Sequence, residues 1–189
     1  QELCAIVQQY PDRKWILVGH SLGGYLSLEM IHRHRELISG CILINSHLRN
    51  DTKKKQKIRD KQISLIKKRG LSPYLRVFYH NMDPSRAAEW QQRFGKQLNV
   101  QAVLDQLVYM RDREVVFTSV EEFTKDNFLG WIHAENDILI ETNDIFDKFS
   151  RLNKGYISVI GGGHLSPLNN SQECLNSIKS MWNYLSFLF

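Results

Sequence analysis

Three residues of this sequence could form a catalytic group in which a serine hydroxyl acts as the nucleophile, and Ser21 is that serine. It lies in the run Gly19-His20-Ser21-Leu22-Gly23, after an apolar stretch that predicts a strand and before a periodic stretch that predicts a helix. A strand, sharp turn and helix in this order hold the hydroxyl exposed, and the Leu22 N–H then points to where an oxyanion can form. We expect glycine at 19 and 23 because a side chain would collide in so sharp a turn. The alternative is a serine that only caps the helix.

The second and third residues are a candidate base and a candidate acid. A serine hydroxyl needs a base to take its proton, and that base needs an acid to orient it. His164 follows a predicted strand and three glycines, and Asp137 follows another predicted strand, so both are expected at the sheet edge that also carries Ser21. Their order along the chain is that of one triad-bearing fold. Glu135 is the local competitor for the acid; the alternatives are a surface-loop histidine and a turn carboxylate.

Other residues are candidates for the surroundings of this site. His20 adjoins Ser21, and adjacent side chains that leave a sharp turn point apart, so we expect it to pack beside the active site rather than act as the base. Together with Tyr74 and Phe78 it is a candidate substrate-binding residue, although packing is the default role of such aromatic residues. The sequence has no phosphate-binding loop, dinucleotide fingerprint or metal-ligand pattern. We therefore predict chemistry that requires neither a cofactor nor a metal.

The elements that must position these residues are parallel strands separated by helices. Strands are predicted at 15–19, 40–45, 127–134 and 155–160, and helices at 3–10, after Ser21, at 144–149 and from 171 onward. The run at 40–45 has no alternating polar positions, as expected of a strand that is covered on both faces. The β-α-β order predicts an α/β protein with a mostly parallel sheet and flanking helices.

A helical insertion is expected to interrupt this sheet. Strand signals nearly vanish between residues 50 and 125, so we predict core segments at 1–49 and 126–189 around a helical cap at 50–125. A charged helix over 53–69 should end at Gly70. Later helix starts are predicted at Ser72-Pro73, Asp83-Pro84, Asn99 and Ser119.

Composition and charge are those of an ordinary globular protein. The chain has 189 residues, 42% hydrophobic and 24% charged, with a formal charge of +5. Much of the excess comes from lysines at 53–69, which alternate with apolar residues as in a solvated helix face rather than a nucleic-acid patch. Three widely spaced cysteines predict reduced thiols and a cytoplasmic location, and no membrane-length stretch or secretory signal is present. A small-molecule substrate is expected, without nucleic-acid or membrane partners; the oligomeric state is open.

These motifs resemble the α/β-hydrolase superfamily, in its cap-bearing branch of carboxylesterases, 3-oxoadipate enol-lactonases and carbon–carbon bond hydrolases. Residues 16–24 resemble its nucleophile elbow, 134–137 its acid turn and 162–168 its base loop. Ala134 stands where glycine is usual, and Asn169-Asn170-Ser171 where Glu-Asn/Gln-Pro often follows. The resemblance implies a serine hydrolase that cleaves a carboxylic ester or lactone through Ser21, His164 and Asp137. The alternatives are a carbon–carbon hydrolase on the same residues and a non-catalytic binding protein on a hydrolase scaffold.

The resemblance also implies strands before the elbow, one of which carries the second oxyanion donor. The sequence begins at Gln1, only a short helix before the predicted strand of Ser21, so we expect a truncated form. Loss of one oxyanion donor costs about 100- to 1000-fold in turnover, so this form is expected to be weakly active.

Overall fold

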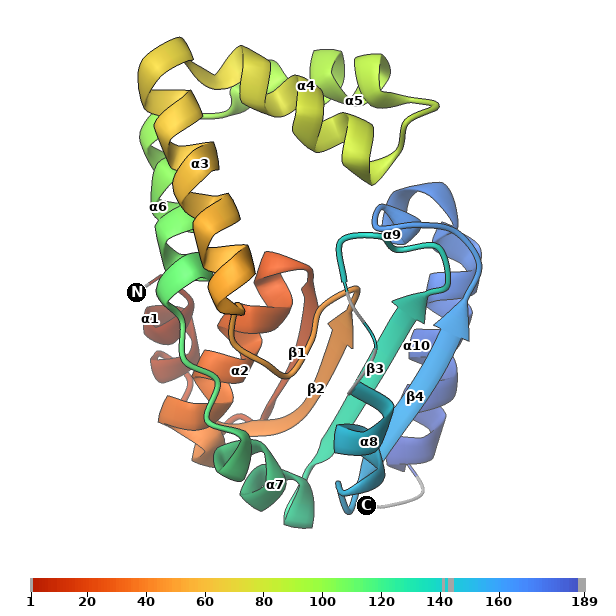
Figure 1. Ribbon diagram of the computed structural model, residues 1–189. Coiled ribbons are helices and arrows are strands. Elements are labelled where there is room, and N and C mark those ends of the chain that lie inside the picture. The colour runs from red at the N-terminus through yellow and green to blue at the C-terminus, as the bar shows by residue number, and fades with distance from the viewer. Residues whose placement is uncertain (1, 141, 143–144, 187–189) are drawn as a thin grey trace. The chain divides into compact units, whose positions relative to one another are not determined.

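The computed structural model describes residues 2–140, 142 and 145–186 and contains a four-stranded, wholly parallel sheet (Figure 1). The strand order is β1-β2-β3-β4, with bounds Trp15–His20, Ile38–Ile44, Phe128–Ala134 and Gly155–Ile160. In register, His20 pairs with Ile44 and Ala134 pairs with Ile160. All four strands therefore end at one edge of the sheet, and the residues that follow them meet there.

Helices cover both faces of the sheet, so the sheet is the middle layer of three. On one face a core cluster joins strand residues such as Leu43 and Trp131 to α1 (Glu2–Gln8), α2 (Leu22–His34) and the helices that flank β3. On the other face Ile42, Ile44 and Ile132 pack with residues of α10 (Ser171–Ser186). The central strands β2 and β3 are apolar on both sides because both sides are covered, whereas the outer strands β1 and β4 keep exposed residues such as Val18 and Val159. The predicted α/β class is confirmed.

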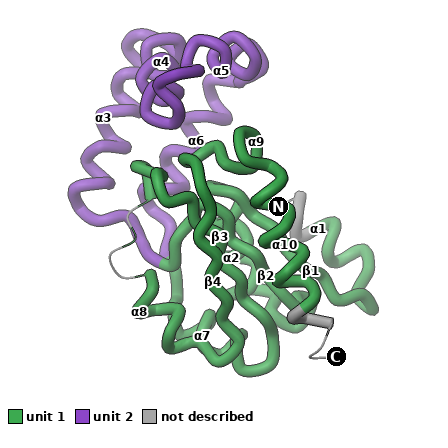
Figure 2. The backbone as a smooth tube through the Cα atoms, turned by 90° about the vertical axis from the view of Figure 1, so that its right-hand side faces the viewer, with its two compact units in different colours: residues 1–48, 115–189 green, residues 49–114 purple. Residues whose placement is uncertain are grey.

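The chain divides into two compact units (Figure 2), and their boundary differs from our prediction. The first unit comprises residues 1–48 and 115–189, and the second comprises 49–114. Residues 115–125, which we assigned to the helical insertion, belong to the first unit. The reason is α7 (Phe117–Asp126), whose Val120 and Phe123 are buried in the same cluster as α2 and β3. The insertion thus ends at residue 114 rather than 125.

The remaining first-unit helices are short. The 3-10 turn Arg35–Leu37 leads from α2 into β2, α8 (Ile145–Ser150) precedes β4, and α9 (Ser166–Asn169) follows it. The predicted helix at 144–149 therefore exists, except that residue 144 lies outside the described residues. The short α9 was not predicted from the sequence.

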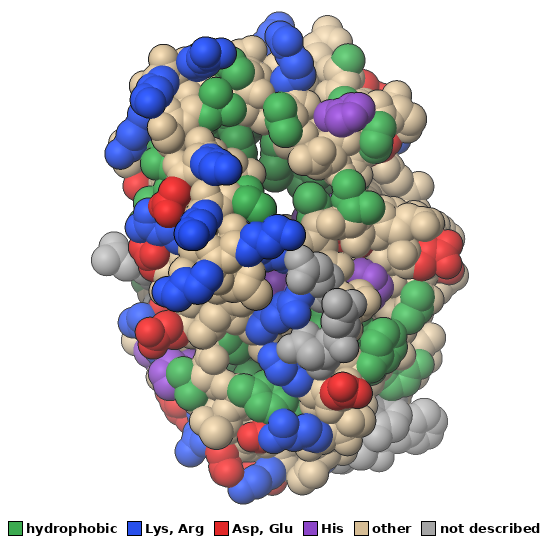
Figure 3. All heavy atoms as spheres, in the orientation of Figure 1, with side chains coloured by type: hydrophobic (Ala, Val, Ile, Leu, Met, Phe, Trp, Pro, Cys, Tyr) green, Lys and Arg blue, Asp and Glu red, His purple; other side chains and the backbone are tan. Residues whose placement is uncertain are grey.

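The second unit is wholly helical. It contains α3, α4, α5, a 3-10 turn and α6, with bounds Lys53–Arg69, Leu71–Met82, Ala87–Phe94, Gly95–Gln97 and Val100–Asp112. The two ends of this unit are joined by the buried pair of Asp51 and Arg113 at 3.1 Å, and Asp51 also pairs with the partly exposed Arg59 at 3.2 Å. Most lysines of α3 are exposed, and in the view of Figure 3 Lys and Arg side chains gather over this helix.

The predicted N-terminal caps of the helices are confirmed in one case and wrong in three. Asn99 caps α6 as predicted, because its side chain accepts the Ala102 N–H. The predicted start at Ser72 is wrong. Gly70, with φ of +76°, ends α3 and directly precedes α4. Pro73 therefore lies in the first turn of α4, where backbone N–H groups make no hydrogen bond within the helix, so its missing N–H is tolerated. Asp83 and Ser119 also do not cap: Asp83 bonds Trp90 Nε1 and Ser119 bonds His32 Nδ1 instead.

Two further predictions concern cysteines and membranes. Cys41 and Cys174 are free and buried, and burial raises the pKa of the Cys41 thiol to about 12, so it packs as an apolar group. The side chain of Cys4 lies outside the described residues. Every helix in the described ranges is too short or too polar to cross a bilayer.

Candidate active site

Ser21 lies at a strained corner between β1 and α2. Its φ is +51° and its ψ is −114°, a conformation that non-glycine residues rarely adopt. The corner is held from the neighbouring strand, because the Ser21 N–H donates to the Ile44 carbonyl at 2.8 Å. The Ser21 side chain makes no capping hydrogen bond to the helix. This hydroxyl is therefore available to another partner.

At two positions of this corner a side chain would overlap neighbouring atoms, so glycine is required there, whereas at a third position it is not. A Cβ on Gly19 would lie 2.4 Å from the Gly23 carbonyl oxygen, and a Cβ on Gly24 would lie 2.5 Å from Ser46 Oγ. Close approach of strand and helix thus excludes a side chain at both positions. A Cβ on Gly23 would meet nothing within 4 Å. Our prediction of a collision is therefore right for Gly19 and wrong for Gly23, which faces open space beside Ser21.

The structure brings Ser21, His164 and Asp137 into one hydrogen-bonded row. Ser21 Oγ lies 2.8 Å from His164 Nε2, and His164 Nδ1 lies 2.8 Å from Asp137 Oδ2. A carboxylate oxygen accepts, so Nδ1 carries the proton; in the neutral ring Nε2 is then the acceptor for the Ser21 O–H. His164 is 3% exposed and Asp137 6% exposed, so the histidine–carboxylate contact is shielded from water.

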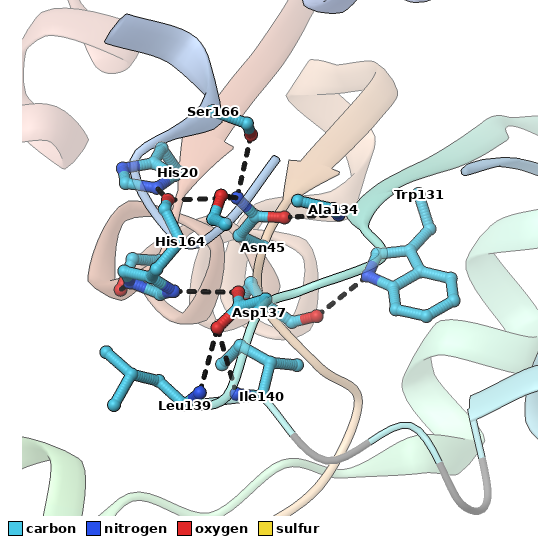
Figure 4. A network of polar contacts seen from close by, with 12 residues as sticks. His20, Asn45, Trp131, Ala134, Asp137, Leu139, Ile140, His164 and Ser166 are labelled. Carbon is cyan, nitrogen blue, oxygen red and sulfur yellow. Dashed lines mark hydrogen bonds and ion pairs between the residues drawn. The ribbon is translucent and has the colours of Figure 1, made fainter. Parts of the chain in front are cut away.

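Backbone contacts hold the acid turn against the base loop. Asp137 Oδ1 accepts the N–H groups of Leu139 and Ile140, which leaves Oδ2 for His164 (Figure 4). The Asn136 N–H donates to the carbonyl of Gly162, a base-loop residue with φ of +94°. The competing carboxylate, Glu135, is exposed. Within the described part of the chain, its side chain accepts a hydrogen bond only from its neighbour Asn136.

A strained serine between a parallel strand and a helix, with this acid and base beyond later strands, is the arrangement seen in one large fold family. The chain has the α/β-hydrolase fold. Residues 2–73 match the family model described as alpha/beta hydrolase fold. Among curated proteins, none matches the sequence significantly.

Solved structures agree with this fold over nearly the whole chain, at low sequence identity. A thermophilic esterase from Thermogutta terrifontis has a TM-score of 0.80 and 16% identity, with coverage of 98% of this chain and 69% of that one. A hydrolase from Pseudomonas aeruginosa has 0.81 and 15%, with 96% and 69% covered. An esterase from Exiguobacterium antarcticum has 0.74 and 16%, with 99% and 71% covered. The TM-scores establish the shared fold, whereas identities this low do not show the activity.

In this hydrolase fold Leu22 stands where an oxyanion donor is expected. It is the first residue of α2, and the first N–H groups of a helix have no acceptor within the helix. Its N–H adjoins Ser21, at the positive end of the helix dipole. The position suits a negative oxygen that forms on an atom bonded to Ser21 Oγ.

His20 lies beside the candidate base, as expected from its place next to Ser21, and a role for it in substrate binding stays a prediction. Its Nε2 lies 2.8 Å from the carbonyl oxygen of His164, so this nitrogen carries a proton and donates it. The two rings are 5.1 Å apart. The pKa of His20 is lowered mainly by burial and, to a smaller extent, by the neighbouring His164, which favours the neutral ring. The contact is with the backbone of the candidate base.

Tyr74 and Phe78 lie on α4 in the second unit. Their rings stack at 5.5 Å, and burial raises the pKa of Tyr74 to about 12, so its hydroxyl stays neutral. Packing within the helical unit accounts for these contacts. A role in substrate binding stays a prediction.

Sequence reasoning missed Asn45, which lies directly after β2 at the same sheet edge as Ser21. Its side chain is fully buried and bonds both to the end of β3 and to the base loop. The available signal was a polar residue immediately after a buried apolar strand. We read Asn45 only as the end of that strand.

Proposed function

We propose that this protein is a serine hydrolase that cleaves a carboxylic ester or lactone through an acyl-enzyme. The observation that carries the proposal is the row Ser21 Oγ, His164 and Asp137, with both contacts at 2.8 Å. Esterases among the solved structures of similar fold support the same reaction class.

In the proposed reaction Ser21 Oγ attacks the substrate carbonyl carbon while His164 Nε2 takes the hydroxyl proton. Asp137 keeps the imidazole in the required tautomer and stabilises the imidazolium. The Leu22 N–H donates to the oxygen that becomes negative. His164 then passes the proton to the leaving oxygen, and water, activated by the same base, releases the acyl group and restores Ser21.

This mechanism uses only side chains and backbone groups of the chain. A small-molecule substrate, the lack of need for a cofactor or metal, the absence of nucleic-acid and membrane partners, and a cytoplasmic location stay predictions. The buried character of the His164–Asp137 contact favours catalysis over a purely structural role, because a solvent-shielded imidazole next to a strained serine is costly to maintain.

Labelling with a fluorophosphonate probe tests the proposal. We expect covalent labelling of the protein, loss of labelling in Ser21→Ala, and unchanged labelling in Ser85→Ala, which removes an exposed serine of the helical unit. Hydrolysis of p-nitrophenyl acetate should follow the same pattern. A protein that remains unlabelled, or a Ser21→Ala variant that labels as the wild type does, contradicts the proposal.

A further inference from the structure

We propose, on the basis of the proposed function, that Asn45 is a positioning residue. It holds His164 so that the imidazole lies within hydrogen-bonding distance of both Ser21 and Asp137. It follows β2, the strand that lies between the strand of Ser21 and the strand of Asp137. Its side chain is 0% exposed. A polar side chain buried to this extent is retained where its hydrogen bonds are made.

The Asn45 amide joins the acid strand to the base loop (Figure 4). Its Oδ1 accepts the N–H of Ala134, the last residue of β3, at 2.9 Å. Its Nδ2 donates to the His164 carbonyl at 2.9 Å and to Ser166 Oγ at 2.9 Å, with the Gly163 carbonyl farther away at 3.3 Å. The orientation of the amide is determined, because an N–H needs an oxygen acceptor and a carbonyl needs a donor.

The backbone at this position restricts the choice of residue as well. Asn45 has φ of +45°, a left-handed conformation that asparagine and aspartate adopt more readily than other non-glycine residues. Its N–H still donates to Ile132, so the sheet ladder continues to this point. An ionised aspartate would satisfy the backbone and the Ala134 N–H but could not donate to His164. Asn45→Asp therefore replaces the donor by a charge, and Asn45→Gly removes the donor without adding one.

The His164 carbonyl receives two donors, Asn45 Nδ2 and His20 Nε2, and these fill both of its lone pairs. The imidazole on the same residue has partners at 2.8 Å on both nitrogens. A backbone shift at His164 would lengthen one of those contacts. Misplacement by about 1 Å costs about 100-fold in rate, so a loosened His164 is expected to lower kcat and leave KM unchanged.

The test compares Asn45→Asp and Asn45→Gly with Asn127→Ala, each on p-nitrophenyl acetate. Glycine removes the side chain without backbone strain, and Asn127 donates to Phe123 beside the opposite end of β3. We expect kcat to fall about 10- to 100-fold in both Asn45 variants, with KM within about twofold of wild type. Asn127→Ala should keep kcat. A kcat within twofold of wild type in the Asn45 variants, or an equal loss in Asn127→Ala, overturns the proposal.

A second measurement separates this proposal from the proposed function. The downfield proton resonance of His164 Nδ1–H, assigned by its absence in His164→Ala, reports the contact with Asp137 without any substrate. We expect it to shift or broaden in Asn45→Asp and to stay unchanged in Asn127→Ala. If the wild type neither labels nor hydrolyses esters, the proposed function fails and this resonance alone decides the positioning role. An unchanged resonance in Asn45→Asp would then refute that role.

Discussion

Asp137 contacts His164 through one carboxylate oxygen only, because its other oxygen is occupied by two backbone N–H groups. Oδ1 accepts from Leu139 and Ile140, at 2.9 and 3.3 Å, and Oδ2 lies 2.8 Å from His164 Nδ1. The turn thus selects which oxygen faces the histidine, and because a carboxylate oxygen can only accept, the proton of the neutral His164 ring lies on Nδ1 and Nε2 faces Ser21 as an acceptor.

Asp137→Asn should reverse that tautomer while it keeps the shape of the site. The two backbone donors require oxygen at the δ1 position, so the new amide N–H₂ would face His164 Nδ1 and force it to accept. The proton would then lie on Nε2, which could no longer take the Ser21 proton. We expect kcat for ester hydrolysis to fall by about 10⁴-fold.

Glu135→Gln is the matched control for that variant, because this neighbouring carboxylate is exposed. It should leave kcat unchanged. Thermal melting should show Asp137→Asn to be folded. An Asp137→Asn protein with wild-type kcat would remove Asp137 from the mechanism.

His20→Phe distinguishes a positioning contact from a substrate contact. The variant keeps an aromatic ring and loses the N–H that donates to His164 at 2.8 Å. Since one hydrogen bond contributes about 1 kcal/mol, kcat should fall about fivefold with KM unchanged. His32→Phe, at an exposed position of α2, is the control. A raised KM with unchanged kcat would instead support the substrate-binding role that the sequence predicts.

Gly19→Ala and Gly23→Ala form a pair that tests the corner around Ser21. The added methyl group would lie 2.4 Å from a backbone oxygen at position 19 and in open space at position 23. Urea denaturation should show that Gly19→Ala lowers the free energy of unfolding by about 1–3 kcal/mol or more. Gly23→Ala should leave it unchanged or raise it slightly, because alanine is favoured in a helix. Equal effects would contradict the close approach.

The second unit should depend on its buried ion pair. Asp51 and Arg113 have side chains that are 1% and 3% exposed, so Asp51→Ala would leave a buried guanidinium without its carboxylate. We expect a loss of about 3–5 kcal/mol in the free energy of unfolding. Asp60→Ala, which breaks an exposed pair with Arg111, should have little effect on urea denaturation. A similarly small effect of Asp51→Ala would show that Arg113 is solvated.

Stability should decrease as the pH falls below about 6.5, partly through His133. Burial lowers the pKa of this histidine below its ordinary value of 6.5, so below that pH the unfolded chain binds a proton that the folded chain does not. The ring stacks on Trp131, and its Nδ1 has no hydrogen-bond partner in the described part of the chain. The stabilisation that comes from keeping His133 neutral is fully present above pH 6.5 and is lost as the pH falls to the lowered pKa of this histidine.

His133→Phe keeps the stack and removes this titration. The free energy of unfolding, measured by urea between pH 7.5 and pH 5, should therefore decrease less steeply in the variant than in the wild type. Burial also lowers the pKa of His20, so a residual slope is expected. Identical slopes in the two proteins would show that His133 takes up its proton in the folded state.

Much of the framework was predictable because its causes are local. The strand, Gly19-to-Gly23 turn and helix around Ser21 follow from residues adjacent in sequence, and so do the apolar strands and the cap that Asn99 gives to α6. Parallel strands that alternate with helices end at one edge, so the meeting place of Ser21, Asp137 and His164 could be anticipated.

The tertiary structure alone decided what depends on contacts between distant residues. Asn45 and His164 are 119 positions apart, and nothing near either one indicates that the amide would reach that carbonyl. His20 and its acceptor are likewise remote in sequence, and α7 joined the first unit because Val120 and Phe123 found a hydrophobic core formed elsewhere. Local patterns determine which elements form, whereas packing determines which side chains those elements bring together.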